Sequence, residues 1–97
     1  MIEHLVAFRF RDDSDAAARA ELLDELRQLP QHFPAMIDFR LGNNVSNRDD
    51  RFSHAFTVRF ASIERLDAYL TSARHEAFVV DMFRPIVAER TIVSFEY

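Results

Sequence analysis

Three of the four histidines and one tyrosine are the side chains best suited to chemistry. His75 is expected at the start of a helix, on its inward face. Burial and the positive helix end both favour a neutral imidazole there, which can accept a proton. Tyr69 is expected on the inward side of the preceding helix, where its hydroxyl could donate a hydrogen bond to a carbonyl oxygen that becomes an enolate. This pair could act on a small carbonyl compound as general base and hydrogen-bond donor.

His4 and His54 each begin a segment with the same template, residues 4–10 (HLVAFRF) and 54–60 (HAFTVRF). Side chains alternate between the two faces of a strand, so each histidine shares a face with apolar residues, mainly phenylalanine. If the two strands are parallel neighbours, the imidazoles of His4 and His54 lie side by side at one end of the sheet. They could orient a polar substrate there, while phenylalanine rings exclude water.

Each of these side chains also has a structural interpretation. A histidine at the end of an apolar strand is more often a hydrogen-bonded structural residue, and a tyrosine on a helical stripe is more often part of the core. Three imidazoles in one cavity could bind zinc, but their spacing is not a metal motif, and we expect neither a metal nor a cofactor. His32, flanked by prolines, is expected at the surface.

Composition excludes several functional classes. The 97 residues suit one domain spanning 1–97, and a net charge of −4 without a dense basic cluster argues against nucleic-acid binding. The absence of cysteine excludes disulfides and thiol catalysis. No apolar run approaches the ~20 residues of a membrane span and no leader pattern precedes the first strand, so we expect a cytoplasmic protein without a membrane partner.

Hydrophobic periodicity predicts the order strand, helix, strand, strand, helices, strand. Pro30 and Pro34 are expected to close the first helix, Gly42 to supply a positive φ or a tight turn, and Pro85 to bend or shorten the last helix. Strands are predicted at 2–11, 36–41, 53–60 and 91–97, and helices at 15–29, 62–70 and 75–86.

This β-α-β-β-α-β order predicts an α+β, ferredoxin-like monomer with an antiparallel-type sheet and helices on one face. We expect the first and third strands to be its central, adjacent and parallel pair. The opposite face carries Leu5 and Ala7, and no further layer of one chain would cover it. A homodimer formed through this sheet face, closing a dimeric α+β barrel, is favoured over a monomer with a modestly apolar exposed sheet.

Ile2 to Phe10, the Ser53-His54-Ala55 segment, and Tyr69 with the run from His75 to Phe78 together resemble the stress-responsive A/B barrel domain family across nearly the whole chain. The resemblance implies the dimeric α+β barrel. The best-understood member in function is a plant enzyme that closes a linear polyketide by aldol condensation. By analogy, Tyr69 and His75, six residues apart, are implied as the catalytic pair, and His4 and His54 as substrate-binding histidines.

One departure affects the substrate. Many relatives carry His-Pro before the last-helix histidine, whereas this chain has Ser72, Ala73 and Arg74. The pocket mouth is therefore expected to differ in shape and charge, and the plant substrate does not carry over. Two functions stay open: a cofactor-independent lyase or cyclase acting on a small apolar carbonyl ligand, and a non-catalytic dimer that binds a small molecule or has a stress-related structural role.

Overall fold

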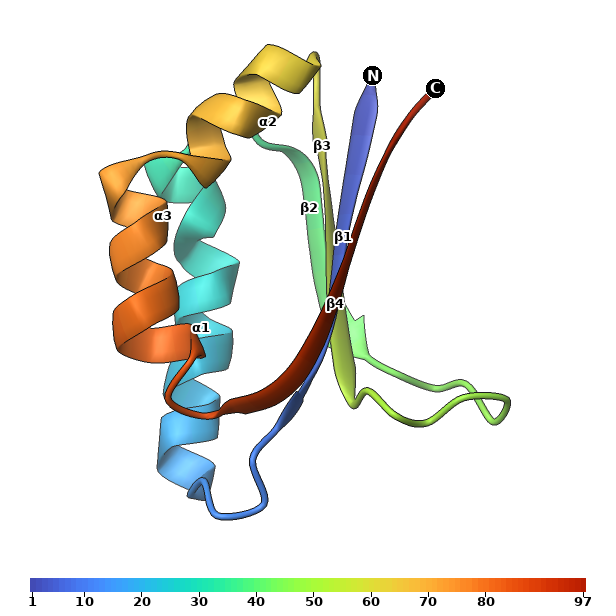
Figure 1. Cartoon of the computed structure of the whole chain (residues 1–97), viewed down its shortest axis with the longest axis vertical. Helices are drawn as coiled ribbons and strands as arrows, with labels where there is room; N and C mark the ends of the chain where they lie inside the picture. Colours follow the sequence, from blue (N-terminus) through green and yellow to red (C-terminus); the bar gives the residue numbers. More distant parts are fainter.

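A computed structural model describes residues 1–97 as one sheet with all helices packed on one of its faces (Figure 1). This confirms the predicted ferredoxin-like α+β fold. No helix combines the length and the apolar character needed to span a membrane. In chain order the elements are β1 (Ile2–Phe10), α1 (Ala16–His32), β2 (Ile37–Asn43), β3 (His54–Phe60), α2 (Ile63–Leu70), α3 (Ala73–Phe78), the π-helical turn η1 (Val79–Phe83) and β4 (Val87–Glu96).

The strand order is β2-β3-β1-β4, and every neighbouring pair is antiparallel. The first and third strands are therefore central and adjacent as predicted, but the prediction that they run parallel was wrong. The first helical crossover joins β1 to β2 and the second joins β3 to β4, and each passes over one intervening strand. The two strands joined by a crossover run in the same direction, so β1 is parallel to β2 and β3 is parallel to β4. Because β2 and β3 are antiparallel, β3 must run against β1.

Strict alternation in β1 fixes which side chains face the helices. Ile2, His4, Val6, Phe8 and Phe10 are buried, whereas the residues between them are only half-buried. The same alternation buries the apolar residues of β3. The core is completed by helix residues spaced three or four apart, and its other members are Leu22, Leu26, Leu29, Leu66, Tyr69 and Phe83.

Local chemistry sets the helix ends. Asp15, Ser62 and Ser72 cap α1, α2 and α3 through their side-chain oxygens. Of the two prolines predicted to close the first helix, Pro30 does not, because α1 continues to His32, whereas the helix does end at the cap residue Phe33, directly before Pro34. Pro30 lies in the last turn of α1, where its missing N–H removes one backbone hydrogen bond without ending the helix.

Two features of β2 differ from expectation. Gly42 has no positive φ and lies within the strand; the residue with positive φ is instead Asp38, at 52°. Asp38 lies where the β2–β3 register shifts, between Ile37 and Arg40, so a bulge takes up the local strain. The predicted need for a special backbone conformation was therefore assigned to the wrong residue.

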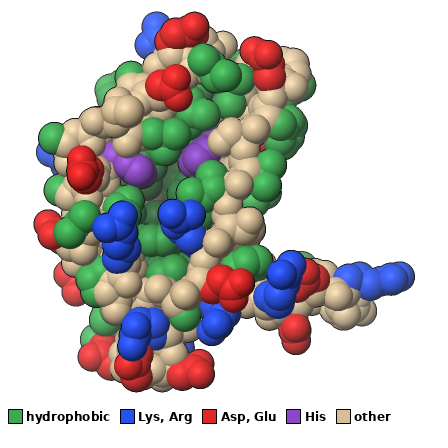
Figure 2. Space-filling view, viewed as in Figure 1, with side chains coloured by type: hydrophobic (Ala, Val, Ile, Leu, Met, Phe, Trp, Pro, Cys, Tyr) green, Lys and Arg blue, Asp and Glu red, His purple; other side chains and the backbone are tan.

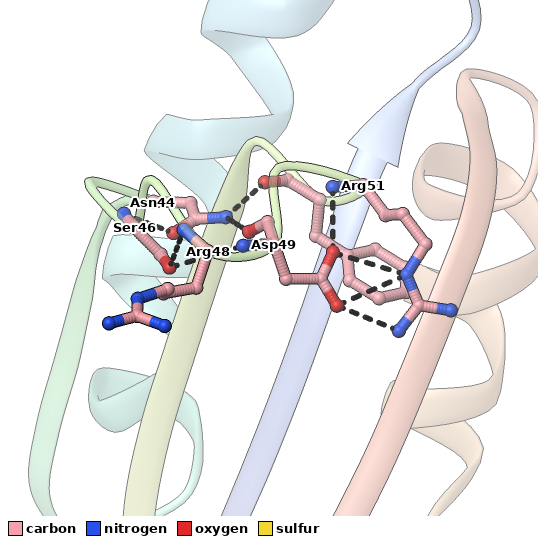
Figure 3. A network of polar contacts seen from close by, with 6 residues as sticks. Asn44, Ser46, Arg48, Asp49 and Arg51 are labelled. Atoms are coloured by element: carbon pink, nitrogen blue, oxygen red, sulfur yellow. Dashed lines mark hydrogen bonds and ion pairs between the residues drawn. The ribbon is translucent and has the colours of Figure 1, made fainter.

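The β2–β3 loop projects away from the body of the molecule (Figure 1). The Asn44 amide donates to the carbonyl oxygens of Asp49 and Phe52, at 3.0 and 2.7 Å (Figure 3). The Arg51 guanidinium pairs with the Asp49 carboxylate at 2.9 Å. The loop is thus shaped by its own polar contacts, and it contributes no residue to the pocket lined by His4, Tyr69 and His75.

Candidate functional site

A cavity of about 210 Å³ lies between the sheet and the segment formed by α2, α3 and η1. In Figure 2 it is a hollow with a largely hydrophobic interior, bordered by histidine side chains and by basic side chains. Such a mostly apolar pocket with a few polar groups is typical of small-molecule sites. Its lining residues are His4, Val6, Phe56, Tyr69, Leu70, His75, Phe78, Val79, Phe83, Arg84, Arg90 and Ile92.

His75 is held by two hydrogen bonds at the start of α3. Its backbone N–H donates to the Ser72 Oγ at 3.1 Å, and its Nδ1 lies 3.1 Å from the Leu70 carbonyl oxygen. A carbonyl oxygen can only accept, so Nδ1 carries the proton and Nε2 of the neutral ring keeps its lone pair. Burial lowers the pKa of His75, although the Leu70 bond and the charge of Glu76 oppose that effect. The ring is therefore neutral at physiological pH, with Nε2 available as a base.

Tyr69 lies beside His75, with ring centroids 4.5 Å apart in an edge-to-face arrangement. Phe33 and Phe60 pack against the same ring. Tyr69 lines the cavity, and its hydroxyl bonds to no other residue; because no buried side-chain nitrogen or oxygen lacks a partner, this hydroxyl is not fully buried. Burial raises the pKa of Tyr69, which keeps the hydroxyl protonated and able to donate.

His4 lies on the sheet side of the cavity and is only 2% exposed. Its Nδ1 is 2.8 Å from the Ser94 Oγ, and its ring centroid is 6.3 Å from that of Tyr69. Burial, together with the repulsion that a protonated His75 would exert, lowers the pKa of His4 to about 4. The imidazole is thus neutral at pH 7, and its Nε2 is left to face the cavity.

His54 does not join these residues. The antiparallel register pairs His54 with Phe8 and His4 with Val58, which puts the two imidazoles at opposite ends of the central strands. His54 stacks on Phe8 with a centroid distance of 5.6 Å, and its Nδ1 is 2.8 Å from the Ser53 Oγ. The prediction that His4 and His54 lie side by side was wrong because the similar segments run in opposite directions.

The zinc alternative required three imidazoles at one point. With His54 at the far end of the strand, His4 and His75 are the only histidines on the cavity. No group of three histidine, cysteine, aspartate or glutamate residues is placed to hold a metal ion. The donor set therefore does not fit an open tetrahedral zinc site.

Two arginines at the cavity were missed by sequence reasoning. Arg84 follows η1 directly, and Arg90 lies on β4, and both contribute to the lining. The signal for Arg90 was weak, because it depends on the register of β4, in which Arg90 pairs with Phe8. His32, at the end of α1, is exposed as predicted.

Comparison with known proteins gives the family. The sequence model described as the stress responsive A/B barrel domain matches residues 2–97, so the chain belongs to that family. Olivetolic acid cyclase from Cannabis sativa is 28% identical over 79 residues, covering 79% of this chain and 78% of the relative.

Two solved structures illustrate the shared fold. Hydroxynitrile lyase from Passiflora edulis superposes with a TM-score of 0.87 at 18% identity, covering 97% of this chain and 90% of that one. A protein of unknown function from Thermobifida fusca, described as dimeric and ferredoxin-like, superposes with a TM-score of 0.82 at 21% identity, covering 99% and 90%. At this level of identity the likeness establishes the fold.

Proposed function

We propose that this stress responsive A/B barrel domain protein is a cofactor-independent lyase or cyclase that removes a proton from the carbon next to a carbonyl group. His75 is the base and Tyr69 the hydrogen-bond donor. The observation that carries the proposal is the bond between His75 Nδ1 and the Leu70 carbonyl, because it fixes the tautomer that leaves Nε2 free on a ring packed edge-to-face against the Tyr69 ring.

In the proposed step, Nε2 of His75 takes the proton from the substrate carbon. Negative charge develops on the carbonyl oxygen as the enolate forms, and the Tyr69 hydroxyl donates a hydrogen bond to it. His4, neutral and held by Ser94, positions the substrate from the sheet side. The apolar lining excludes water, which strengthens the Tyr69 hydrogen bond in the transition state.

The names of two relatives support this type of reaction. One is named a cyclase and another a hydroxynitrile lyase, and both names fit reactions in which a carbonyl group forms or reacts. His54 has no part in the proposed step, since it lies on a different, polar surface depression with Arg19 and Arg51.

Deuterium exchange tests the proposal directly. We expect the protein to accelerate exchange of the methyl protons of acetophenone in D₂O, followed by proton NMR. General base catalysis contributes typically ~10²–10⁴-fold, so His75→Gln should lower the exchange rate at least ~100-fold, and Tyr69→Phe by a similar factor. His32→Gln removes an exposed histidine outside the cavity and is the matched control.

The outcomes separate enzyme from binding protein. If wild-type protein exchanges no ketone faster than buffer, or if His75→Gln behaves like His32→Gln, the catalytic proposal fails. A protein that bound ketones without exchange would then support the non-catalytic, small-molecule-binding alternative.

We also infer a homodimer formed through the outer sheet face. Val93, Phe95 and Tyr97 on or just after β4 are 50%, 51% and 62% exposed, and their register places them beside the half-buried outer residues Glu3 and Leu5 of β1. An apolar face of this kind typically marks an interface. The Thermobifida fusca neighbour is described as dimeric, which supports the same assembly here.

A further inference from the structure

Two unpaired positive charges border the cavity. Neither the Arg84 nor the Arg90 guanidinium takes part in any of the ion pairs or side-chain hydrogen bonds of the structure, although both residues line the pocket. They come from different elements, since Arg84 follows η1 and Arg90 lies on β4. Arg90 is on the side of the sheet that faces the helices, as shown by its register partner Phe8, which is fully buried on that side. Two cations thus approach one opening from opposite walls, as the basic side chains beside the hollow in Figure 2 illustrate.

The arginines lie at the end of the cavity opposite the catalytic pair. On β4, Arg90 precedes Ser94, the partner of His4, by four residues, which is ~13 Å at the usual strand rise. On the helical wall, Arg84 follows His75 by nine residues, which is at most ~13 Å at the α-helical rise and somewhat less here because the π-helical η1 rises less per residue. Both walls therefore separate the basic end from the histidine and tyrosine end by a similar length.

No acidic group lines this cavity to neutralise the arginines. Glu89, the acidic neighbour of Arg90 in sequence, is engaged on the outer side of the sheet, where its carboxylate accepts a bond from Arg9 Nε at 3.2 Å. The cavity surface thus carries two guanidinium groups and two neutral imidazoles. Such a cleft attracts anions, and a guanidinium fork matches the geometry of a carboxylate.

We propose that Arg84 and Arg90 form the anion-binding end of the pocket, so that its substrate is a carbonyl compound bearing a carboxylate at the end remote from the reacting carbonyl. The size of the cavity limits the rest of the molecule. An apolar cavity of about 150 Å³ accommodates benzene, and the volume here is about 210 Å³. One ring or a comparable alkyl chain fits between the two ends.

This assignment rests on the proposed function for the identity of the carbonyl end. A pair of ligands of equal size isolates the charge: 4-acetylbenzoate carries a carboxylate opposite its methyl ketone, and 1,4-diacetylbenzene replaces that carboxylate with a neutral acetyl group. Binding to the intact protein is measured by calorimetry and by NMR shifts, without any turnover.

We expect 4-acetylbenzoate to bind more tightly than 1,4-diacetylbenzene, and the difference to shrink as sodium chloride is added. Arg84→Gln and Arg90→Gln should each weaken binding of the anion about tenfold, the equivalent of ~1.4 kcal/mol, and leave the neutral ligand unaffected. Arg48→Gln is the matched control, because Arg48 is exposed on the β2–β3 loop with its guanidinium directed away from the other side chains drawn in Figure 3.

Several results would overturn the inference: equal affinity for the two ligands, no binding of 4-acetylbenzoate at millimolar concentration, or arginine variants that match Arg48→Gln. The proposed function fails separately. Anion preference without exchange of acetophenone refutes only the catalytic step, whereas exchange of acetophenone without anion preference refutes only the role of Arg84 and Arg90.

Discussion

Burial of His4 predicts that the protein loses stability in mildly acidic solution. The pKa of His4 is about 4 in the folded protein, against 6.5 for the unperturbed side chain. The unfolded chain therefore binds the proton first as pH falls, and protonation draws the equilibrium toward unfolding. His4 imposes no such loss above pH ~6.5, and the stability is lost progressively as pH falls from 6.5 toward 4.

The two pKa values set the magnitude. Proton linkage with 6.5 in the unfolded chain and about 4 in the folded protein gives a loss of ~2 kcal/mol in the free energy of unfolding between pH 7 and pH 5. This interval lies above the usual titration range of aspartate and glutamate, so carboxylates contribute little. The pKa values of His54 and His75 are also lowered, and both residues add to the loss in the same direction.

His4→Asn isolates the contribution of His4. Its side-chain amide can still reach the Ser94 hydroxyl but does not titrate. The measurement is urea unfolding of wild type and variant at pH 7, 6 and 5, at one protein concentration because subunit association affects apparent stability. The variant should be less stable at pH 7, owing to lost packing, yet ~2 kcal/mol less sensitive to the change to pH 5. If wild type and variant lose the same stability within ~0.5 kcal/mol, the inferred burial of a neutral His4 is wrong.

Three further predictions concern the fold and the assembly. Light scattering should give a dimer of about twice 11.4 kDa, and Leu5→Asp on the outer sheet face should dissociate or unfold it, since a charge would be buried unpaired; a wild-type monomer would contradict this. Asp15→Ala should lower the free energy of unfolding by ~1 kcal/mol through loss of the cap of α1, measured by urea unfolding, and an unchanged midpoint would count against the cap. His75→Ala should cost under ~1 kcal/mol in the same assay if the residue serves chemistry, whereas a cost of ~1–3 kcal/mol would favour a structural role.

The sequence by itself determined the order of the elements and the face on which each side chain lies. Strict alternation assigned His4 and Phe8 to the helix side of β1 and Leu5 to the outer side, as the structure confirms. Helical periodicity assigned Tyr69 and His75 to inward positions, and they meet at one cavity. These features depend on neighbours a few residues apart, so a local pattern contains the information needed to predict them.

Only the tertiary structure decided which chemical groups meet. The direction of β3 relative to β1 follows from the way the two helical crossovers interleave. Because the two strands are antiparallel, their similar sequences put His54 and His4 at opposite ends of the sheet. The free Nε2 of His75 depends on the Leu70 carbonyl, and the gathering of Arg84 and Arg90 depends on the register of β4. Strand direction and register are fixed by contacts between residues distant in sequence, and a one-residue shift in β4 would turn Arg90 to the opposite face.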